Sequence, residues 1–146
     1  MSTGKLTLTS FLTLDDVMFR IVGQRFGNAD AFVLGRKTYQ IFAAYSLIRG
    51  DLAEQVAELK PRSPREIQVH GSGDLAQTLI ARDLVDEYHL WLYPVILGIG
   101  KRLFAPGTVP AALTLAETTT TSTGVVVSIY RRAGKPTYGS FELDQA

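Results

Sequence analysis

The fold is decided by the stretch Glu66-Ile67-Gln68-Val69-His70-Gly71-Ser72-Gly73-Asp74-Leu75. Residues 66–70 have the composition of a β-strand, the glycines mark a turn, and residues 75–82 have a helical pattern. A strand, a turn and a helix in succession are the repeating unit of an α/β sheet. The stretch therefore predicts a strand, glycine turn and helix unit inside an α/β fold.

Before this stretch, the chain predicts two strands and three helices. Apolar residues that alternate with β-formers favour the first strand, and a short apolar run that ends at a glycine favours a buried parallel strand. The expected strands span residues 5–13 and 31–34, and the expected helices span residues 19–26, 38–45 and 51–60. Asp51 is a plausible cap for the last helix, and Pro61 and Pro64 are expected to stop it.

After this stretch, the sequence predicts mainly β-structure. Residues 86–97 form a long β-rich run, and residues 113–121 and 125–131 flank a Thr-Ser-Thr-Gly turn as in a hairpin. Strands that alternate with helices and then end in antiparallel strands indicate an α/β sheet. The length fits one globular unit, so we expect residues 1–146 to form a single domain.

Composition limits the classes of function. The chain has no cysteine, which excludes a disulfide scaffold, a cysteine nucleophile and thiolate metal sites, and is compatible with a reducing cytoplasm. Fifteen basic and fourteen acidic side chains leave almost no net field to attract nucleic acid or anionic lipid. We therefore expect a soluble cytoplasmic protein that acts on a small molecule, with no nucleic-acid or membrane partner.

Two segments place glycine after a predicted strand and open a helix with polar residues. They are Leu34-Gly35-Arg36-Lys37-Thr38 and His70-Gly71-Ser72-Gly73-Asp74. The start of a helix presents unpaired N–H groups and partial positive charge, and glycine allows close backbone approach, so each segment is suited to a phosphate. Glycine after a strand is also ordinary turn chemistry, which leaves both interpretations open for either segment alone.

These segments also carry a resemblance to known families. Leu34-Gly35-Arg36-Lys37-Thr38-Tyr39 resembles the helix-opening segment of dihydrofolate reductases, and residues 67–73 are similar to their later strand and paired-glycine turn. Val85-Asp86-Glu87-Tyr88 together with residues 94–104 resembles the RibD C-terminal reductase-like family. The resemblance extends through nearly the whole chain. It implies an α/β, dihydrofolate-reductase-like three-layer fold, with a mostly parallel central sheet and an antiparallel C-terminal hairpin.

The resemblance also implies a cofactor, NADPH, and the residues that bind it. The residues expected at its adenosine-side phosphates are Gly35, Arg36, Lys37 and Thr38. Those expected at its pyrophosphate are Gly71, Ser72, Gly73, Asp74 and Leu75. Those expected to line the nicotinamide and substrate region are Leu14, Asp15 and Val17, with Pro94 and Leu97 at its border. Asp16 stands where the family usually has glycine.

Several candidate side chains have a structural and a functional interpretation. Asp15 is either a general acid or substrate anchor, or a turn-capping residue. Lys101 and Arg102 either bind a substrate phosphate or form a solvated surface. His70 is interpreted as a hydrogen-bonded strand residue, and His89 as facing a polar surface or a subunit interface. The two histidines are separated, so no metal site is expected.

The chain departs from the family at two places. It lacks a segment between Met18 and Phe19 and another between Tyr45 and Ser46, of which the second normally carries a further β-strand. Losing an internal strand leaves unpaired backbone groups inside a sheet. Either the chain is a natural or engineered short form, or the sequence as given omits the two segments; we expect the omission.

Together these features predict an NADPH-dependent reductase of a small soluble substrate. The nearest activity that the resemblance names is 5-amino-6-(5-phosphoribosylamino)uracil reductase of riboflavin biosynthesis. Two alternatives stay open: a non-catalytic nucleotide-binding or sensor module with the same fold, and a dihydrofolate reductase. The resemblance further implies a homodimer.

Overall fold

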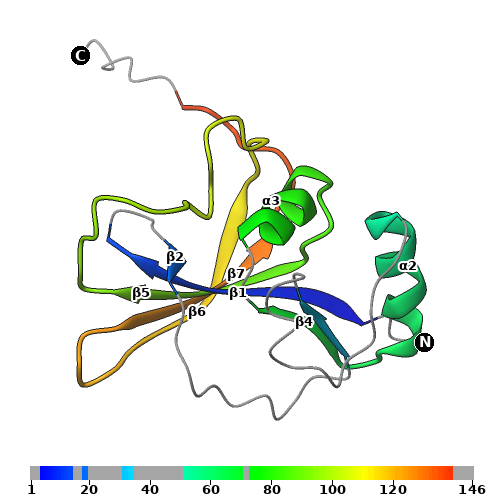
Figure 1. Ribbon diagram of the computed structural model, residues 1–146, viewed down its shortest axis with the longest axis horizontal. Helices are drawn as coiled ribbons and strands as arrows, with labels where there is room; N and C mark the ends of the chain where they lie inside the picture. Colours follow the sequence, from blue (N-terminus) through cyan, green and yellow to red (C-terminus); the bar gives the residue numbers. More distant parts are fainter. Residues whose placement is uncertain (1–3, 15–17, 20–30, 35–50, 71–72, 140–146) are drawn as a thin grey trace, which may run out of the picture.

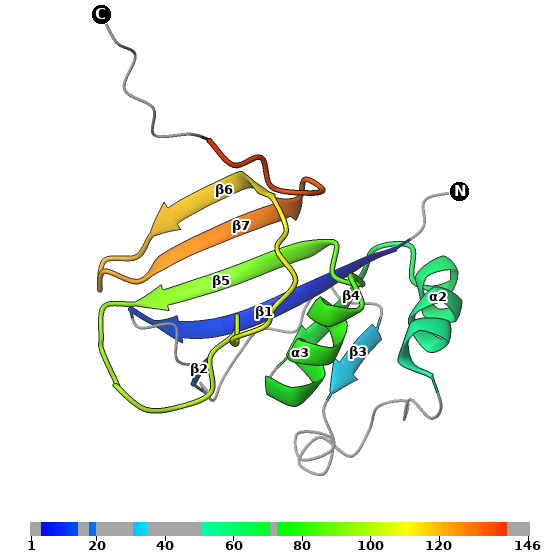
Figure 2. The same cartoon turned by 90° about the horizontal axis from the view of Figure 1, so that it is seen from above.

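A mixed β-sheet forms the centre of the protein in the computed structural model, which describes residues 4–14, 18–19, 31–34, 51–70 and 73–139. Within these residues the sheet has seven strands in the order β3-β4-β1-β5-β7-β6, with β2 paired to β1 off this path (Figures 1 and 2). The strands are β1 (Lys5–Thr13), β2 (Met18–Phe19), β3 (Ala31–Leu34), β4 (Glu66–His70), β5 (Glu87–Tyr93), β6 (Leu113–Thr120) and β7 (Val126–Arg132). The helices are α2 (Leu52–Arg62) and α3 (Gly73–Ala81).

The strand directions confirm the expected α/β class. β3, β4, β1 and β5 are neighbours and run parallel, whereas β7 is antiparallel to β5 and pairs with β6 in an antiparallel hairpin. Gly124 lies in the hairpin turn with φ +83°, a conformation that side chains disfavour, and its N–H donates to the carbonyl of Thr121. The carboxyl ends of the four parallel strands therefore meet at one edge of the sheet.

The hydrophobic core lies between the sheet and the two helices. Leu6 and Leu8 of β1 pair in register with Ile67 and Val69 of β4, so these four side chains share one face. They belong to one buried cluster with Val56 of α2 and with Ala76, Leu79 and Ile80 of α3. Figures 1 and 2 place α3 over the middle of the sheet and α2 beside the start of β1. Both described helices thus contribute to the same core.

Helix α2 begins as predicted and ends later than predicted. The carboxylate of Asp51 accepts hydrogen bonds from the N–H groups of Ala53, at 2.9 Å, and Glu54, at 3.2 Å, which confirms the predicted cap. The helix continues through Pro61 to Arg62, so the prediction that Pro61 stops it is wrong. A proline in the last turn removes one backbone donor near the helix end, where the chain leaves the helix anyway.

Other boundaries differ for identifiable reasons. Phe19, predicted to start a helix, lies in β2 and pairs with Phe11. The predicted β-run 86–97 ends at Tyr93, because Pro94 has no N–H to continue a ladder. The rest of the helix predicted over 19–26, and the whole of the one predicted over 38–45, lie outside the described residues. In the described part of the chain, neither helix is long and apolar enough to cross a membrane.

Candidate functional site

The carboxyl edge of the parallel strands carries the start of helix α3. β4 ends at His70 and α3 begins at Gly73, so two residues separate the strand from the helix. The N–H groups of the first helical turn have no partners within the helix and face the N-terminal end of α3. Backbone donors of this kind bind phosphate and other anions. Asp74, however, places a carboxylate in this first turn.

The loop that follows β5 is attached to α3 by side-chain contacts. The side-chain amide of Gln77 donates to the backbone carbonyls of Arg102, at 3.0 Å, and Leu103. Lys101 Nζ lies 2.6 Å from Asp74 Oδ1. Leu103 has no exposed surface and belongs to the core cluster. Lys101, predicted to contact substrate, therefore lies beside Asp74, predicted to contact the cofactor.

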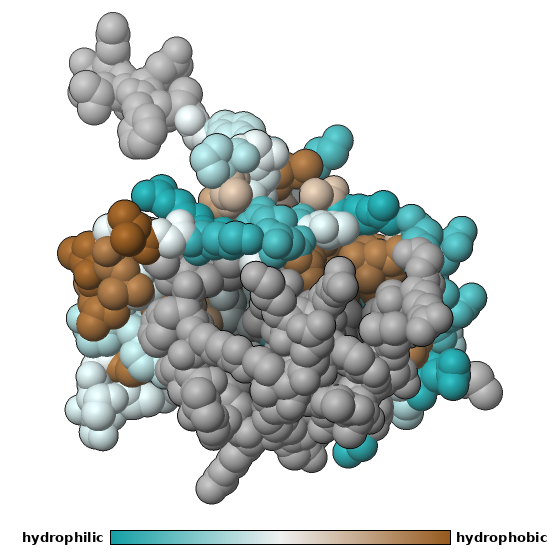
Figure 3. Space-filling model, in the orientation of Figure 1, coloured by the Kyte–Doolittle hydropathy of each residue, from teal (hydrophilic) through white to brown (hydrophobic). Residues whose placement is uncertain are grey.

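The other end of the same loop lies against the end of β1. The N–H of Leu14 donates to the carbonyl of Val95 at 2.8 Å, so Leu14 lies beside the residue that follows Pro94. Val95, Ile96, Leu97 and Ile99 are all exposed, Ile99 to 87 %, and give the brown patch at the left of Figure 3. Leu14 is also exposed. The predicted nicotinamide and substrate region thus has an apolar surface in its described part.

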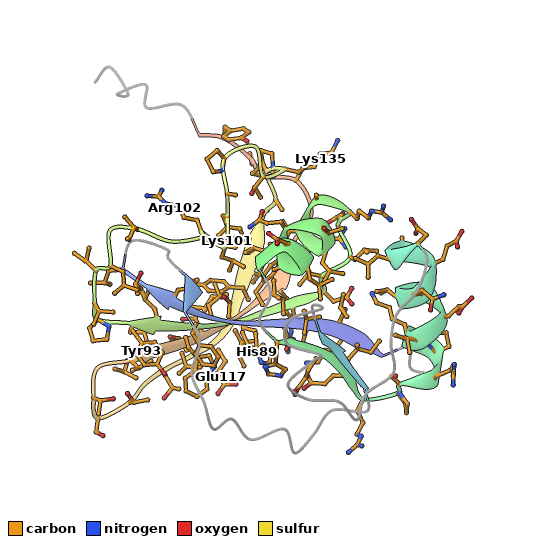
Figure 4. All side chains as sticks on the ribbon, in the orientation of Figure 1. His89, Tyr93, Lys101, Arg102, Glu117 and Lys135 are labelled. Atoms are coloured by element: carbon orange, nitrogen blue, oxygen red, sulfur yellow. The ribbon has the colours of Figure 1, made fainter. Side chains whose placement is uncertain are left out.

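The sheet face opposite the helices carries a polar network. Glu87 Oε1 lies 2.7 Å from both Lys5 Nζ and His89 Nε2, and Glu87 Oε2 lies 3.2 Å from Arg131 Nε. Figure 4 shows His89 on one side of the central strands and Lys101 on the other. His89 therefore faces a polar surface as predicted, and the loop lysine lies away from it.

Glu87 is charged in a buried position. Burial raises the pKa of its carboxyl group, but hydrogen bonds from Lys5, His89 and Arg131 outweigh burial and lower the pKa to about 2. The side chain of Glu87 is only 5 % exposed, so these partners stabilise a carboxylate that has little contact with water. Glu87 is thus ionised throughout the physiological range and links β1, β5 and β7.

His70 is fixed by its neighbours on β4. Gln68 donates its side-chain N–H to Glu66, which leaves its oxygen to accept from His70 Nε2 at 2.9 Å. The Nε2–H tautomer of His70 follows from this arrangement. Burial lowers the pKa of His70 to about 4, against the opposing effect of Glu66. The interpretation of His70 as a hydrogen-bonded strand residue is confirmed.

Sequence reasoning missed three residues of this region, namely Gln77, Glu87 and Lys5. Gln77 follows Asp74 by three residues and so shares its helix face, a spacing that could have indicated a joint role. Glu87 belongs to the segment that carried the family resemblance, but no role was predicted for it. Lys5 gave no signal, because only strand pairing brings it to Glu87.

Many predicted site residues lie outside the described part of the chain. They are Asp15, Val17, Gly35, Arg36, Lys37, Thr38, Gly71 and Ser72. Met18 and Phe19 are consecutive in β2, while Tyr45 and Ser46 also lie outside the described residues, so the two omitted segments stay a prediction. Among the described side chains, no group of three or more metal-ligating residues is placed to hold an ion.

Comparison with known proteins gives both sequence and fold matches. Residues 36–127 match the family model described as RibD C-terminal domain. The uncharacterized protein YyaP of Bacillus subtilis (strain 168) is 34 % identical over 103 residues, which cover 70 % of this chain and 55 % of YyaP. The chain therefore spans about half the length of this relative.

Two solved structures show the same fold. A putative riboflavin biosynthesis protein from Shewanella sp. PV-4 is 18 % identical with a TM-score of 0.72, over 88 % of this chain and 99 % of that chain. A dihydrofolate reductase from Enterococcus faecalis, in complex with NADP(H), is 11 % identical with a TM-score of 0.64, over 90 % of this chain and 98 % of that chain. These likenesses confirm the predicted dihydrofolate-reductase-like α/β fold.

The pKa of His70 predicts how stability depends on pH. The unfolded chain takes up a proton on this residue near pH 6.5, whereas the folded protein does so only near pH 4. The free energy of unfolding should therefore fall by about 3 kcal/mol as the pH drops through this window. His70→Gln, which keeps a side-chain N–H, should flatten the dependence. Urea unfolding at both ends of the window measures it, and an unchanged slope in the variant would contradict the assignment.

Proposed function

Since the chain belongs to the RibD C-terminal domain family, we propose that it is an NADPH-dependent reductase of a small soluble substrate. The match over residues 36–127 carries this proposal, because that range includes both the start of α3 and the loop attached to it. The nearest named activity is 5-amino-6-(5-phosphoribosylamino)uracil reductase of riboflavin biosynthesis. The likeness to a riboflavin biosynthesis protein and to a reductase in complex with NADP(H) supports this choice.

The described residues fit a dinucleotide at the start of α3. Gly73 opens the helix two residues beyond the end of β4, and the first-turn N–H groups are suited to phosphate oxygens. The residues that we propose for the pyrophosphate are Gly71, Ser72, Gly73, Asp74 and Leu75, with Asp74 acting through its backbone N–H alone. Those that we propose for the adenosine-side phosphates are Gly35, Arg36, Lys37 and Thr38. NADPH, when bound, supplies the hydride for the reduction.

The protein's contribution is to orient the substrate, exclude water and provide a proton. The apolar surface of Leu14, Pro94 and Leu97 is proposed to border the reacting end, with Val17 beside it. Asp15 or a bound water is proposed as the proton donor. We also propose Arg102 as a substrate-binding residue, because its positive charge lies on the loop after β5, which also carries Pro94 and Leu97.

We further propose that the protein is a cytoplasmic homodimer. Strand β6 is one of the two outer strands in the strand order of the described sheet, and seven of its eight residues are exposed. An outer strand has unpaired backbone groups along one side, which favours association with a second chain. Light scattering at micromolar concentration should return the mass of a dimer. A monomer alone under these conditions contradicts the proposal.

The proposed function predicts both cofactor binding and turnover. NADPH should change the intrinsic protein fluorescence on binding, and its near-ultraviolet absorbance should fall when an acceptor is reduced. The panel includes 5-amino-6-(5-phosphoribosylamino)uracil, dihydrofolate and small carbonyl compounds. Binding without oxidation across the panel indicates a non-catalytic nucleotide-binding module instead. Absence of NADPH binding contradicts the proposed function altogether.

The choice of NADPH over NADH is predicted to depend on Arg36. The two cofactors differ by one ribose phosphate, and Arg36 and Lys37 form an adjacent basic pair after a strand. Arg36→Ala should weaken NADPH binding by roughly 1.5–3 kcal/mol, the usual value for a hydrogen bond to a charged group, and NADH binding much less. Titration of both cofactors decides the point. Equal losses of NADPH and NADH affinity, or no loss of either, would show that Arg36 does not bind the ribose phosphate.

A further inference from the structure

An ion pair joins the start of α3 to the loop after β5. Lys101 Nζ lies 2.6 Å from Asp74 Oδ1, and the two side chains are 68 % and 85 % exposed. Figure 4 shows Lys101 beside the first turn of α3, whereas Arg102 extends away from it. An exposed pair of this kind contributes little to folding stability. This ion pair is therefore distinguished by its position at the start of α3 rather than by a contribution to stability.

The lysine is held there by a second contact. Gln77, three residues after Asp74 on α3, donates its side-chain amide to the carbonyls of Arg102 and Leu103. Leu103 is fully buried in the core, so the chain directly after Lys101 cannot move away from the helix without opening that core. Gln77 and Leu103 thus fix the backbone that carries Lys101 close to Asp74.

The charge at this point bears directly on the cofactor. In the absence of ligand, a carboxylate in the first turn is favourable to the helix dipole. A bound pyrophosphate occupies the same positive region and carries negative charge, so it is repelled by Asp74. Lys101, which makes contact with the carboxylate, cancels this repulsion while leaving the backbone N–H groups available.

We propose that Lys101 serves the cofactor half of the site rather than the substrate half, by neutralising Asp74 so that the start of α3 accepts the pyrophosphate of NADPH. Gln77 is the positioning residue that presents Lys101 to Asp74. This proposal rests on the proposed function, because it assumes that the cofactor is NADPH. It changes the role predicted for Lys101 from the sequence.

Four variants test the proposal through the dissociation constant of NADPH, measured by fluorescence titration. Lys101→Met should weaken binding by roughly three- to tenfold at low ionic strength, since it removes the positive charge that lies beside Asp74. The double variant Asp74→Asn with Lys101→Met should return to within roughly twofold of wild type, because the repelling charge is gone. Asp74→Asn alone, which removes the side-chain charge but keeps the backbone N–H proposed to bind the pyrophosphate, should bind at least as tightly as wild type. Lys135→Met, an exposed lysine elsewhere, is the control for net charge and should have no effect.

The salt dependence of binding and a variant of Gln77 distinguish an electrostatic role of Lys101 from a structural one. The effect of Lys101→Met should shrink toward none at about 1 M salt, where screening acts within about 3 Å. Gln77→Leu should weaken NADPH binding to a similar extent and add nothing in the Lys101→Met background. Melting temperatures of all variants check that the fold is intact. A loss that is independent of salt overturns the electrostatic role.

The outcomes distinguish this inference from the proposed function. If wild type does not bind NADPH, the proposed function fails and this inference fails with it. If wild type binds NADPH and Lys101→Met binds it equally well, only the inference fails. If the double variant stays as weak as Lys101→Met, Lys101 contacts the cofactor directly, and neutralisation of Asp74 is wrong.

Discussion

Burial of β1 on both of its faces is the constraint on which the rest of the structure depends. Leu6 and Leu8 point into the core beneath the helices, and Thr7 and Thr13 on the opposite face are also fully buried. The backbone of such a strand has no access to water, so it must form hydrogen bonds along both edges. β1 does so with β4 and β5, in parallel register on both sides. This pairing brings the carboxyl ends of β4 and β5 to the edge where α3 begins.

The same pairing explains the buried charge on the opposite face. The register between β1 and β5 pairs Glu87 with Thr7, which leaves it within reach of Lys5 on the same strand, and the register between β5 and β7 pairs it with Arg131. A buried carboxylate without such partners is strongly destabilising. The polar face is therefore possible only because three strands deliver charges to one point. His70, Gln68 and Glu66 extend this polar face along β4 to its last residue.

Local sequence patterns predict where the strands lie better than they predict which residues contact one another in the fold. The pattern predicts β4 to the residue, since alternation and the glycine after it are both local signals. Phe19 and Pro61 were assigned wrongly, because pairing with β1 and the position within the last helical turn override local preference. The Gln77 contacts join residues 25 and 26 positions apart and depend on how α3 packs. The glycine segments predict where the proposed site lies, but the partners of its charged side chains depend on the tertiary structure.

The loop after β5 gives the proposed site its internal geometry. At one end its backbone accepts a hydrogen bond from Leu14, and at the other its carbonyls accept from Gln77. Leu103 fixes the second end in the core, while Ile96 and Ile99 between the two ends are exposed. The same loop thus contacts both the end of β1 and helix α3, which carry the two places where we propose that the substrate and the pyrophosphate of the cofactor bind.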